Sequence, residues 1–116
     1  VVHGADGLDE ISTTGESWIA EVREGVVRAG VVCPEDFGVA RAAITDLLGG
    51  DREQNAEIIR RVLAGEPGPK RDMVVVNAAA ALVAGGKARE LKEGAQLAAH
   101  SIDSRAAAGK LQALAA

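Results

Sequence analysis

The segment RDMVVVNAAAALVAGG, residues 71–86, constrains the fold of this chain more than any other. Its apolar residues fall on every side of a helix, and helices of this kind pack in the interior of a protein. The valine run could also form a strand, but the uninterrupted length to Leu82 and the four alanines favour a helix. The segment therefore predicts a buried helix, with its ends marked by Asp72 and by Gly85 and Gly86.

The remaining core has to be built almost without aromatic side chains. The chain of 116 residues is 47% hydrophobic but only 2% aromatic, so valine, isoleucine, leucine and alanine must fill the interior. Such a core favours closely packed helices. A chain of this length suits one domain, in which folding buries roughly two-thirds of the surface that the unfolded chain exposes.

Two β-rich runs, SWIAEV and VVRAGVVC, lie within residues 17–33. Residues 23–25 separate them and include a glycine that tolerates a positive φ, so the runs predict a β-hairpin. Val1 and Val2 are typical of the inside of a further strand. Because the sequence opens in this way and carries no initiator methionine, we expect a fragment of a larger protein.

Helical patterns follow the hairpin. PEDFG at 34–38 predicts a helical turn or a loop, and Asp51 followed by Gln54 is a capping-box pattern for a helix that ends at Gly65. The last helix is expected to be capped by Asp103 or Ser104. Besides the buried segment, the expected helices are 39–48, 51–65, 88–102 and a final helix that runs to the C-terminus. Taken alone this is an α+β layout in which many helices cover little sheet, so further strands are expected elsewhere.

Charge and cysteine content exclude several classes of function. The net charge is -4, and the 13 basic side chains form no stripe that could neutralise phosphates. Trp18 and Phe37 alone cannot form a platform for stacking bases, so we expect no nucleic-acid partner. No apolar run approaches the roughly 20 residues that span a bilayer, so we expect no membrane association. The single Cys33 fits a reducing compartment, and we expect a cytoplasmic protein.

Three acids, Asp6, Asp9 and Glu10, lie among glycines in HGADGLDEIST at residues 3–13. On a strand the side chains of Asp9 and Glu10 would point to opposite faces, but on an irregular chain they can converge. Mg²⁺ usually binds through one or two carboxylates plus waters and substrate phosphates, which such a pair could complete. The alternative is a solvated polar turn, and the residue types alone leave both open.

The other candidate groups have simpler explanations. His3 and His100 have no second histidine or cysteine near them in the sequence, which favours structural roles. Cys33 is typical of a small buried hydrophobe. AGGK at 84–87 lacks the spacing of a phosphate loop and fits a helix C-cap. Spacing alone therefore indicates no catalytic residue and no cofactor-binding residue.

The order of several motifs resembles the C-terminal part of the anthranilate phosphoribosyltransferase family, over nearly the whole chain. These motifs are VVHGADGLDEIST, PEDFGV, LLGGDREQNAEIIRRVLAGEPGPKRDMVVVNAAAAL and LKEGAQLAAHSIDS. That family transfers the phosphoribosyl group of phosphoribosyl pyrophosphate to anthranilate in tryptophan biosynthesis, with Mg²⁺ on the pyrophosphate. The resemblance implies an α/β fold of the nucleoside phosphorylase/phosphoribosyltransferase architecture. Residues 1–116 would be the C-terminal portion of its large catalytic domain, a mixed-sheet domain, with an N-terminal strand and a β-hairpin followed by about five helices.

The resemblance carries one functional assignment onto this chain. The Asp-Glu pair of the family's GLDE motif, a Mg²⁺ site, falls on Asp9 and Glu10. It implies that both hold Mg²⁺ against the diphosphate, and that Glu10 contacts both metals where two are bound. Neutralising the leaving pyrophosphate is the main electrostatic task of such a displacement. Asp6 is left as a turn residue.

The family's other functional parts lie upstream of the matched segment. These are the glycine-rich phosphate loop, the anthranilate-contacting positions and the helical domain through which members form homodimers. We therefore expect this chain to be inactive alone. One departure is Arg105, where the family commonly has a glycine, the residue able to take a left-handed turn. Two other interpretations stay open: a pyrimidine nucleoside phosphorylase-like fragment, and a non-catalytic interaction module.

Overall fold

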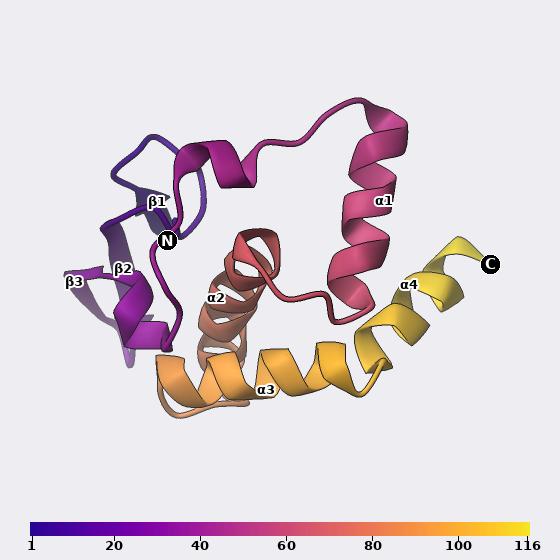
Figure 1. The fold of residues 1–116 in the computed structure, drawn as a ribbon. Coiled ribbons are helices and arrows are strands. Elements are labelled where there is room, and N and C mark those ends of the chain that lie inside the picture. Colours follow the sequence, from indigo (N-terminus) through magenta and orange to yellow (C-terminus); the bar gives the residue numbers. More distant parts are fainter.

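The computed structural model describes residues 1–116 and places a small sheet beside a group of helices (Figure 1). Helix α2 (Pro69–Ala84) lies between the sheet on one side and α1 (Arg52–Leu63) and α4 (Ala106–Ala115) on the other, and α3 (Leu91–Asp103) packs along it. The strands are β1 (Val2–Gly4), β2 (Ser17–Arg23) and β3 (Val26–Val32). The helices are α1 (Arg52–Leu63), α2 (Pro69–Ala84), α3 (Leu91–Asp103) and α4 (Ala106–Ala115), with 3-10 turns η1 (Pro34–Phe37) and η2 (Ile44–Leu47).

The sheet has the order β1-β2-β3, and both pairings are antiparallel. Strands β2 and β3 form the predicted hairpin, with Arg23 opposite Val26. The two residues of its turn, Glu24 and Gly25, both have positive φ, which is the type I′ geometry that matches the twist of the strands. The α/β class and the hairpin are thus confirmed. Any parallel pairing of the expected mixed sheet would lie outside these residues.

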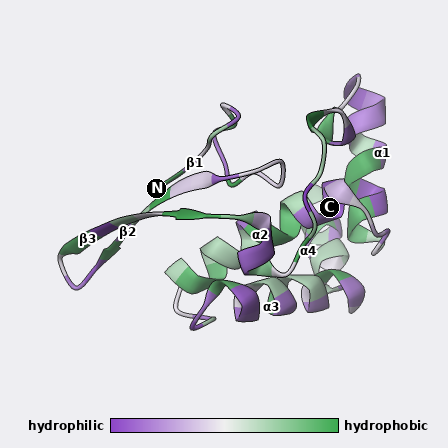
Figure 2. Ribbon diagram, turned by 60° about the vertical axis from the view of Figure 1, so that its left-hand side comes forward, coloured by the Kyte–Doolittle hydropathy of each residue, from purple (hydrophilic) through white to green (hydrophobic).

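The core forms where α2 and α3 pack together under the sheet. The buried hydrophobic residues of this cluster are Ile11, Val32, Phe37, Val75, Val76, Ala79, Ala95, Ala98 and Ile102. In Figure 2 the hydrophobic side of α3 faces α2 and its hydrophilic side faces away. Helix α2 is confirmed as the central helix, although it begins at Pro69 rather than near Asp72, because proline suits the first turn of a helix. It is not buried on every side: Val74 is 44% exposed.

Glycine lets α2 and α3 approach closely. A Cβ atom at Gly94 of α3 would lie 2.7 Å from the carbonyl oxygen of Ala79 and 3.0 Å from its Cα, which is closer than real Cβ atoms come. Both atoms belong to the backbone of α2, so they cannot swing aside. The glycine that interrupts the helical pattern of α3 is therefore the contact point between the two helices.

The prediction of a helix over 39–48 is wrong. Only the 3-10 turn Ile44–Leu47 forms there, because neighbouring groups take the backbone donors that a helix would use. The amide of Ala42 donates to the carbonyl of Thr13 (2.9 Å), and the amide of Ala43 donates to Asp46 Oδ2 (3.0 Å). The chain thus has four α-helices and two 3-10 turns instead of about five helices.

The helix ends follow the sequence signals to different degrees. Helix α1 is confirmed: Asp51 accepts from the amide of Gln54 at 2.8 Å, and the Gln54 side chain accepts from the amide of Asp51. Helix α3 begins at Leu91, three residues later than the expected Ala88. Neither Asp103 nor Ser104 caps α4; its N-cap is Arg105, in the left-handed conformation with φ 66°. None of the helices has the length and apolarity needed to cross a bilayer.

The close contact at Gly94 predicts opposite effects for two glycine substitutions. Gly94→Ala should lower the free energy of unfolding by about 1–3 kcal/mol, because the new methyl group overlaps the backbone of α2. Gly109 of α4 has no atom within 4 Å of its Cβ position. Gly109→Ala should therefore raise stability by about 0.5–1 kcal/mol through helix propensity alone. Urea unfolding followed by circular dichroism measures both, and a neutral Gly94→Ala would contradict the contact.

The left-handed backbone of Arg105 predicts that glycine stabilises this position. A side chain in this conformation costs roughly 1–2 kcal/mol, which the greater freedom of glycine in the unfolded chain partly offsets. Arg105→Gly should therefore raise the free energy of unfolding by about 0.5–1 kcal/mol. Arg105→Ala keeps the Cβ atom and is the matched control. An equal gain from both variants in urea unfolding would show that backbone strain is not the cause.

Candidate metal site

The candidate metal ligands lie on the loop between β1 and β2, residues 5–16, which we call the acidic loop. Its ends are tied together because the amide of Ala5 donates to the carbonyl of Glu16 at 2.9 Å. Gly7 takes a positive φ of 98°, and its amide donates to the carbonyl of Gly4 at 3.0 Å, which closes a tight turn directly after β1. These two hydrogen bonds therefore fix the conformation of the loop where it leaves β1 and where it enters β2.

Asp6 organises the acidic loop from within. Its carboxylate accepts hydrogen bonds from the Ser12 hydroxyl, from Thr14 Oγ1 at 2.7 Å and from the Leu8 amide at 3.1 Å. Burial alone would raise the pKa of Asp6, but these hydrogen bonds outweigh it and lower the pKa below its ordinary value. Because both carboxylate oxygens are engaged, Asp6 is a turn residue, as its place in the sequence indicates.

Asn77 of α2 fastens the acidic loop to the helices. Its Oδ1 accepts from the amide of Ile11 at 2.9 Å, and its Nδ2 donates to the carbonyl of Ile11 at 2.8 Å. The same Nδ2 donates to the Met73 carbonyl at 3.0 Å, one turn earlier in α2, which fixes the orientation of the amide. Ile11 is only 1% exposed, so both of its backbone groups need a partner inside the protein.

The end of the loop that follows Ile11 is buried as well. Ser12, Thr13 and Ser17 are each at most 1% exposed, and the amide of Ser12 donates to Ser17 Oγ at 2.9 Å. The carbonyl of Thr13 accepts from Ala42, as described above. The rigid part of the loop therefore begins at Ile11 and continues into β2.

Asp9 and Glu10 are adjacent on the exposed part of the acidic loop. Neither carboxylate takes part in any hydrogen bond or ion pair within the chain, in contrast to Asp6. No three histidine, cysteine, aspartate or glutamate side chains lie close enough to hold a metal ion together. Two free carboxylates suit Mg²⁺, which commonly takes one or two from the protein and completes its shell with water and phosphate oxygens. They do not suit a metal enclosed entirely by protein ligands.

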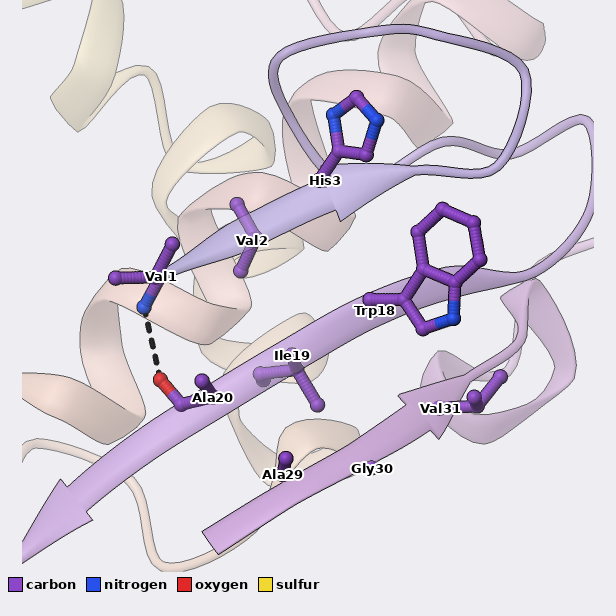
Figure 3. A pocket seen from close by; sticks show the side chains of 9 residues that line it. All are labelled: Val1, Val2, His3, Trp18, Ile19, Ala20, Ala29, Gly30 and Val31. Atoms are coloured by element: carbon purple, nitrogen blue, oxygen red, sulfur yellow. Dashed lines mark hydrogen bonds between the residues drawn. The ribbon is translucent and has the colours of Figure 1, made fainter. Parts of the chain in front are cut away.

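The remaining candidate groups have structural roles. His3 stacks on Trp18, with ring centroids 5.8 Å apart, on one face of the sheet (Figure 3). Gly85 and Gly86 follow the end of α2, and Gly86 has a positive φ of 67°, so AGGK is the end of a helix. His100 lies exposed in the last turn of α3. None of them joins the acidic loop.

Two hollows of the surface also lie away from the acidic loop. One, of about 400 Å³, is the mainly apolar hollow over the sheet in Figure 3, with His3 as its sole ionisable side chain. The other, of about 910 Å³, lies between the sheet and the adjoining ends of α2 and α3. Neither is lined by a residue of 5–16. The structure therefore does not enclose the carboxylates of Asp9 and Glu10 in a pocket of this chain.

Comparison with known proteins identifies close relatives of the whole chain. The anthranilate phosphoribosyltransferase of Parvibaculum lavamentivorans is 58% identical over 116 residues, which are 100% of this chain and 34% of that protein. The enzyme of the same name from Syntrophotalea carbinolica is 50% identical over 114 residues, 98% of this chain and 32% of that protein. The chain thus spans about a third of the length of these relatives.

Solved structures share the fold described above. The anthranilate phosphoribosyltransferase of Thermus thermophilus matches 90% of this chain and 31% of its own, with a TM-score of 0.81 and 42% identity. The Saccharomyces cerevisiae enzyme in complex with PRPP and Mg matches 96% of this chain and 32% of its own, with a TM-score of 0.86 and 26% identity. Residues 1–108 also match the model of the a/b domain of a glycosyl transferase family. Since that match covers nearly all of the 116 residues, the chain belongs to this glycosyl transferase family.

Proposed function

We propose that this chain is the C-terminal portion of the large domain of an anthranilate phosphoribosyltransferase. The complete enzyme would transfer the phosphoribosyl group of phosphoribosyl pyrophosphate to anthranilate in tryptophan biosynthesis. The observation that carries the proposal is the pair Asp9 and Glu10: two adjacent, exposed carboxylates without a partner, on a loop held by hydrogen bonds on both sides of them. The yeast structure that shares this fold is a complex with PRPP and Mg, which supports the same chemistry here.

Asp9 and Glu10 are the residues that would hold Mg²⁺ against the diphosphate. When bound, the metal supplies positive charge that stabilises the departing pyrophosphate. This chain would present two carboxylates to the cation, while the third carboxylate of the motif, that of Asp6, is hydrogen-bonded within the loop. The hydrogen bonds of Asp6 with Ser12, Thr14 and Leu8 keep it from competing for the metal.

The exposed face of the sheet supports the proposal that the rest of the enzyme packs here. Ile19 and Val2 pack toward the core, so their neighbours along the strands point away from the helices. The outward residues form three apolar cross-strand pairs: Trp18 with Val31, Ala20 with Ala29, and Val22 with Val27. Val22 is 70% and Val27 65% exposed. Continuous apolar faces of this kind usually mark a contact with another part of a protein.

Other features of the complete enzyme stay predictions. We propose that it is a cytoplasmic homodimer, with the phosphate loop, the anthranilate site and the dimer contacts in the two-thirds of the relatives' length that this chain does not span. The related activity of a pyrimidine nucleoside phosphorylase is disfavoured because the relatives described above carry the transferase name. A non-catalytic module is disfavoured because relatives that match the whole chain carry the name of an enzyme.

The metal assignment predicts a severe loss of activity when both carboxylates become amides. The test uses the complete enzyme, either the full polypeptide that contains these residues or the P. lavamentivorans relative with its matching third replaced by them. Asp9→Asn with Glu10→Gln should lower Mg²⁺-dependent phosphoribosyl transfer by about 100-fold or more, because neutral amides hold the cation poorly. Glu16→Gln, another exposed acid of the loop, is the control and should keep near-normal kinetics. Unchanged kinetics in the double variant would refute the assignment.

The 116-residue chain alone should not catalyse the transfer. It holds two candidate ligands for the metal but none of the residues assigned to the phosphate loop or the anthranilate site. Purified chain incubated with phosphoribosyl pyrophosphate, anthranilate and Mg²⁺ should consume no anthranilate, as followed by its fluorescence. Turnover without any added protein would show that the chain contains a complete active site.

A further inference from the structure

We infer that Asn77 is a positioning residue for the metal site, and that its two hydrogen bonds to Ile11 set where the carboxylates of Asp9 and Glu10 lie. This inference rests on the proposed function and deepens it. Asn77 has no role in the metal assignment itself, because its side-chain amide is fully engaged with the backbone of Ile11 and Met73. Its effect would pass through the loop.

The geometry that supports this is a pair of anchors around the two carboxylates. On one side, the amide of Leu8 donates to Asp6 Oδ1 at 3.1 Å, and the carbonyl of Leu8 accepts from Gly4 at 2.9 Å. On the other side, both backbone groups of Ile11 are bonded to Asn77. Asp9 and Glu10 are the only residues between these anchors, so little backbone freedom remains to them.

The two anchors differ in what they are attached to. The anchor at Leu8 is local, since Gly4 and Asp6 belong to the same turn. The anchor at Ile11 joins residues that are 66 positions apart in the sequence and ties the loop to α2, the central helix. A side-chain amide pairs with a peptide group through one acceptor and one donor, much as a neighbouring strand would. Without it, the loop would keep its own turn and the packing of the Ile11 side chain, but its backbone would lose the two hydrogen bonds that position it on α2.

The chain contains a matched control for this interaction. Asn55 of α1 makes the same pair of bonds: Gly50 donates its amide to Asn55 Oδ1 at 2.8 Å, and Asn55 Nδ2 donates to the carbonyl of Gly50 at 3.0 Å. That clamp is local and exposed, and it lies at the start of α1 rather than at the acidic loop. A substitution there removes the same pair of hydrogen bonds to a backbone amide and carbonyl, and leaves the anchors of Asp9 and Glu10 in place.

The experiment compares Asn77→Leu and Asn55→Leu in the complete enzyme. Leucine has nearly the shape of asparagine but can neither donate nor accept. In Asn77→Leu the Mg²⁺ concentration for half-maximal activity should rise by about 10–100-fold, the usual effect of losing a group that orients a metal ligand. The KM for anthranilate should stay unchanged. Asn55→Leu should change the Mg²⁺ requirement by about twofold or less.

A second measurement tests the loop without metal or turnover. In the metal-free enzyme, hydrogen exchange read by mass spectrometry on the peptide that contains Ile11 should be slow in the wild type and in Asn55→Leu. It should be faster in Asn77→Leu, because the Ile11 amide has lost its acceptor. Should Asn77→Leu fail to fold, Asn77→Asp serves instead: it keeps Oδ1 as an acceptor for the Ile11 amide and loses the Nδ2 donor to the carbonyls of Ile11 and Met73, so its readout is the Mg²⁺ requirement.

The outcomes separate this inference from the proposed function. A raised Mg²⁺ requirement with a normal KM for anthranilate and faster loop exchange supports the positioning role. An active enzyme in which the Asn77 variants and Asn55→Leu have the same Mg²⁺ requirement as the wild type overturns the role and leaves the proposed function standing. A wild-type enzyme with no Mg²⁺-dependent transfer overturns the proposed function, and the inference with it.

Discussion

The two hydrogen bonds between Asn77 and Ile11 are the constraint on which the rest of the arrangement depends. They join the first loop of the chain to its central helix. A donor or acceptor that is buried without a partner lowers the free energy of unfolding by about 1–3 kcal/mol. Ile11 contributes its side chain to the core at the same point. Ile11 therefore links the acidic loop to the core and to α2. We infer that the packing of this core sets the position of the carboxylates of Asp9 and Glu10.

The parts of the fold that could be predicted from the sequence are those that local chemistry determines. The hairpin of β2 and β3 needs only two β-rich runs with a glycine tolerant of positive φ between them. The start of α1 needs only Asp51 and Gln54, three residues apart. The helix expected over 39–48 failed because a distant group, the carbonyl of Thr13, takes the amide of Ala42.

The same division holds for the candidate site. The carboxylates of Asp9 and Glu10 could be proposed from their motif, whereas the clamp that holds them could not, because Asn77 lies in a segment that its composition marks as core. One signal was nevertheless present: a half-buried amide in an apolar helix needs hydrogen-bond partners, so Asn77 among valines and alanines indicates a backbone group brought there by another segment. Gly94 carries a similar signal, since a glycine inside a helix often indicates a close contact with another backbone.

Asp6, Asp9 and Glu10 are three acids of one short loop, and they differ in their surroundings more than in their chemistry. Asp6 is satisfied by two hydroxyl groups and an amide, which stabilise its charge and lower its pKa. The carboxylates of Asp9 and Glu10 accept no hydrogen bond from the chain, although two neighbouring negative charges repel each other. A fold selected for stability alone would favour a lysine or a hydroxyl group near them, as it does near Asp6. Their lack of partners, on a loop anchored on both sides, leaves both carboxylates free for the cation that we propose they bind.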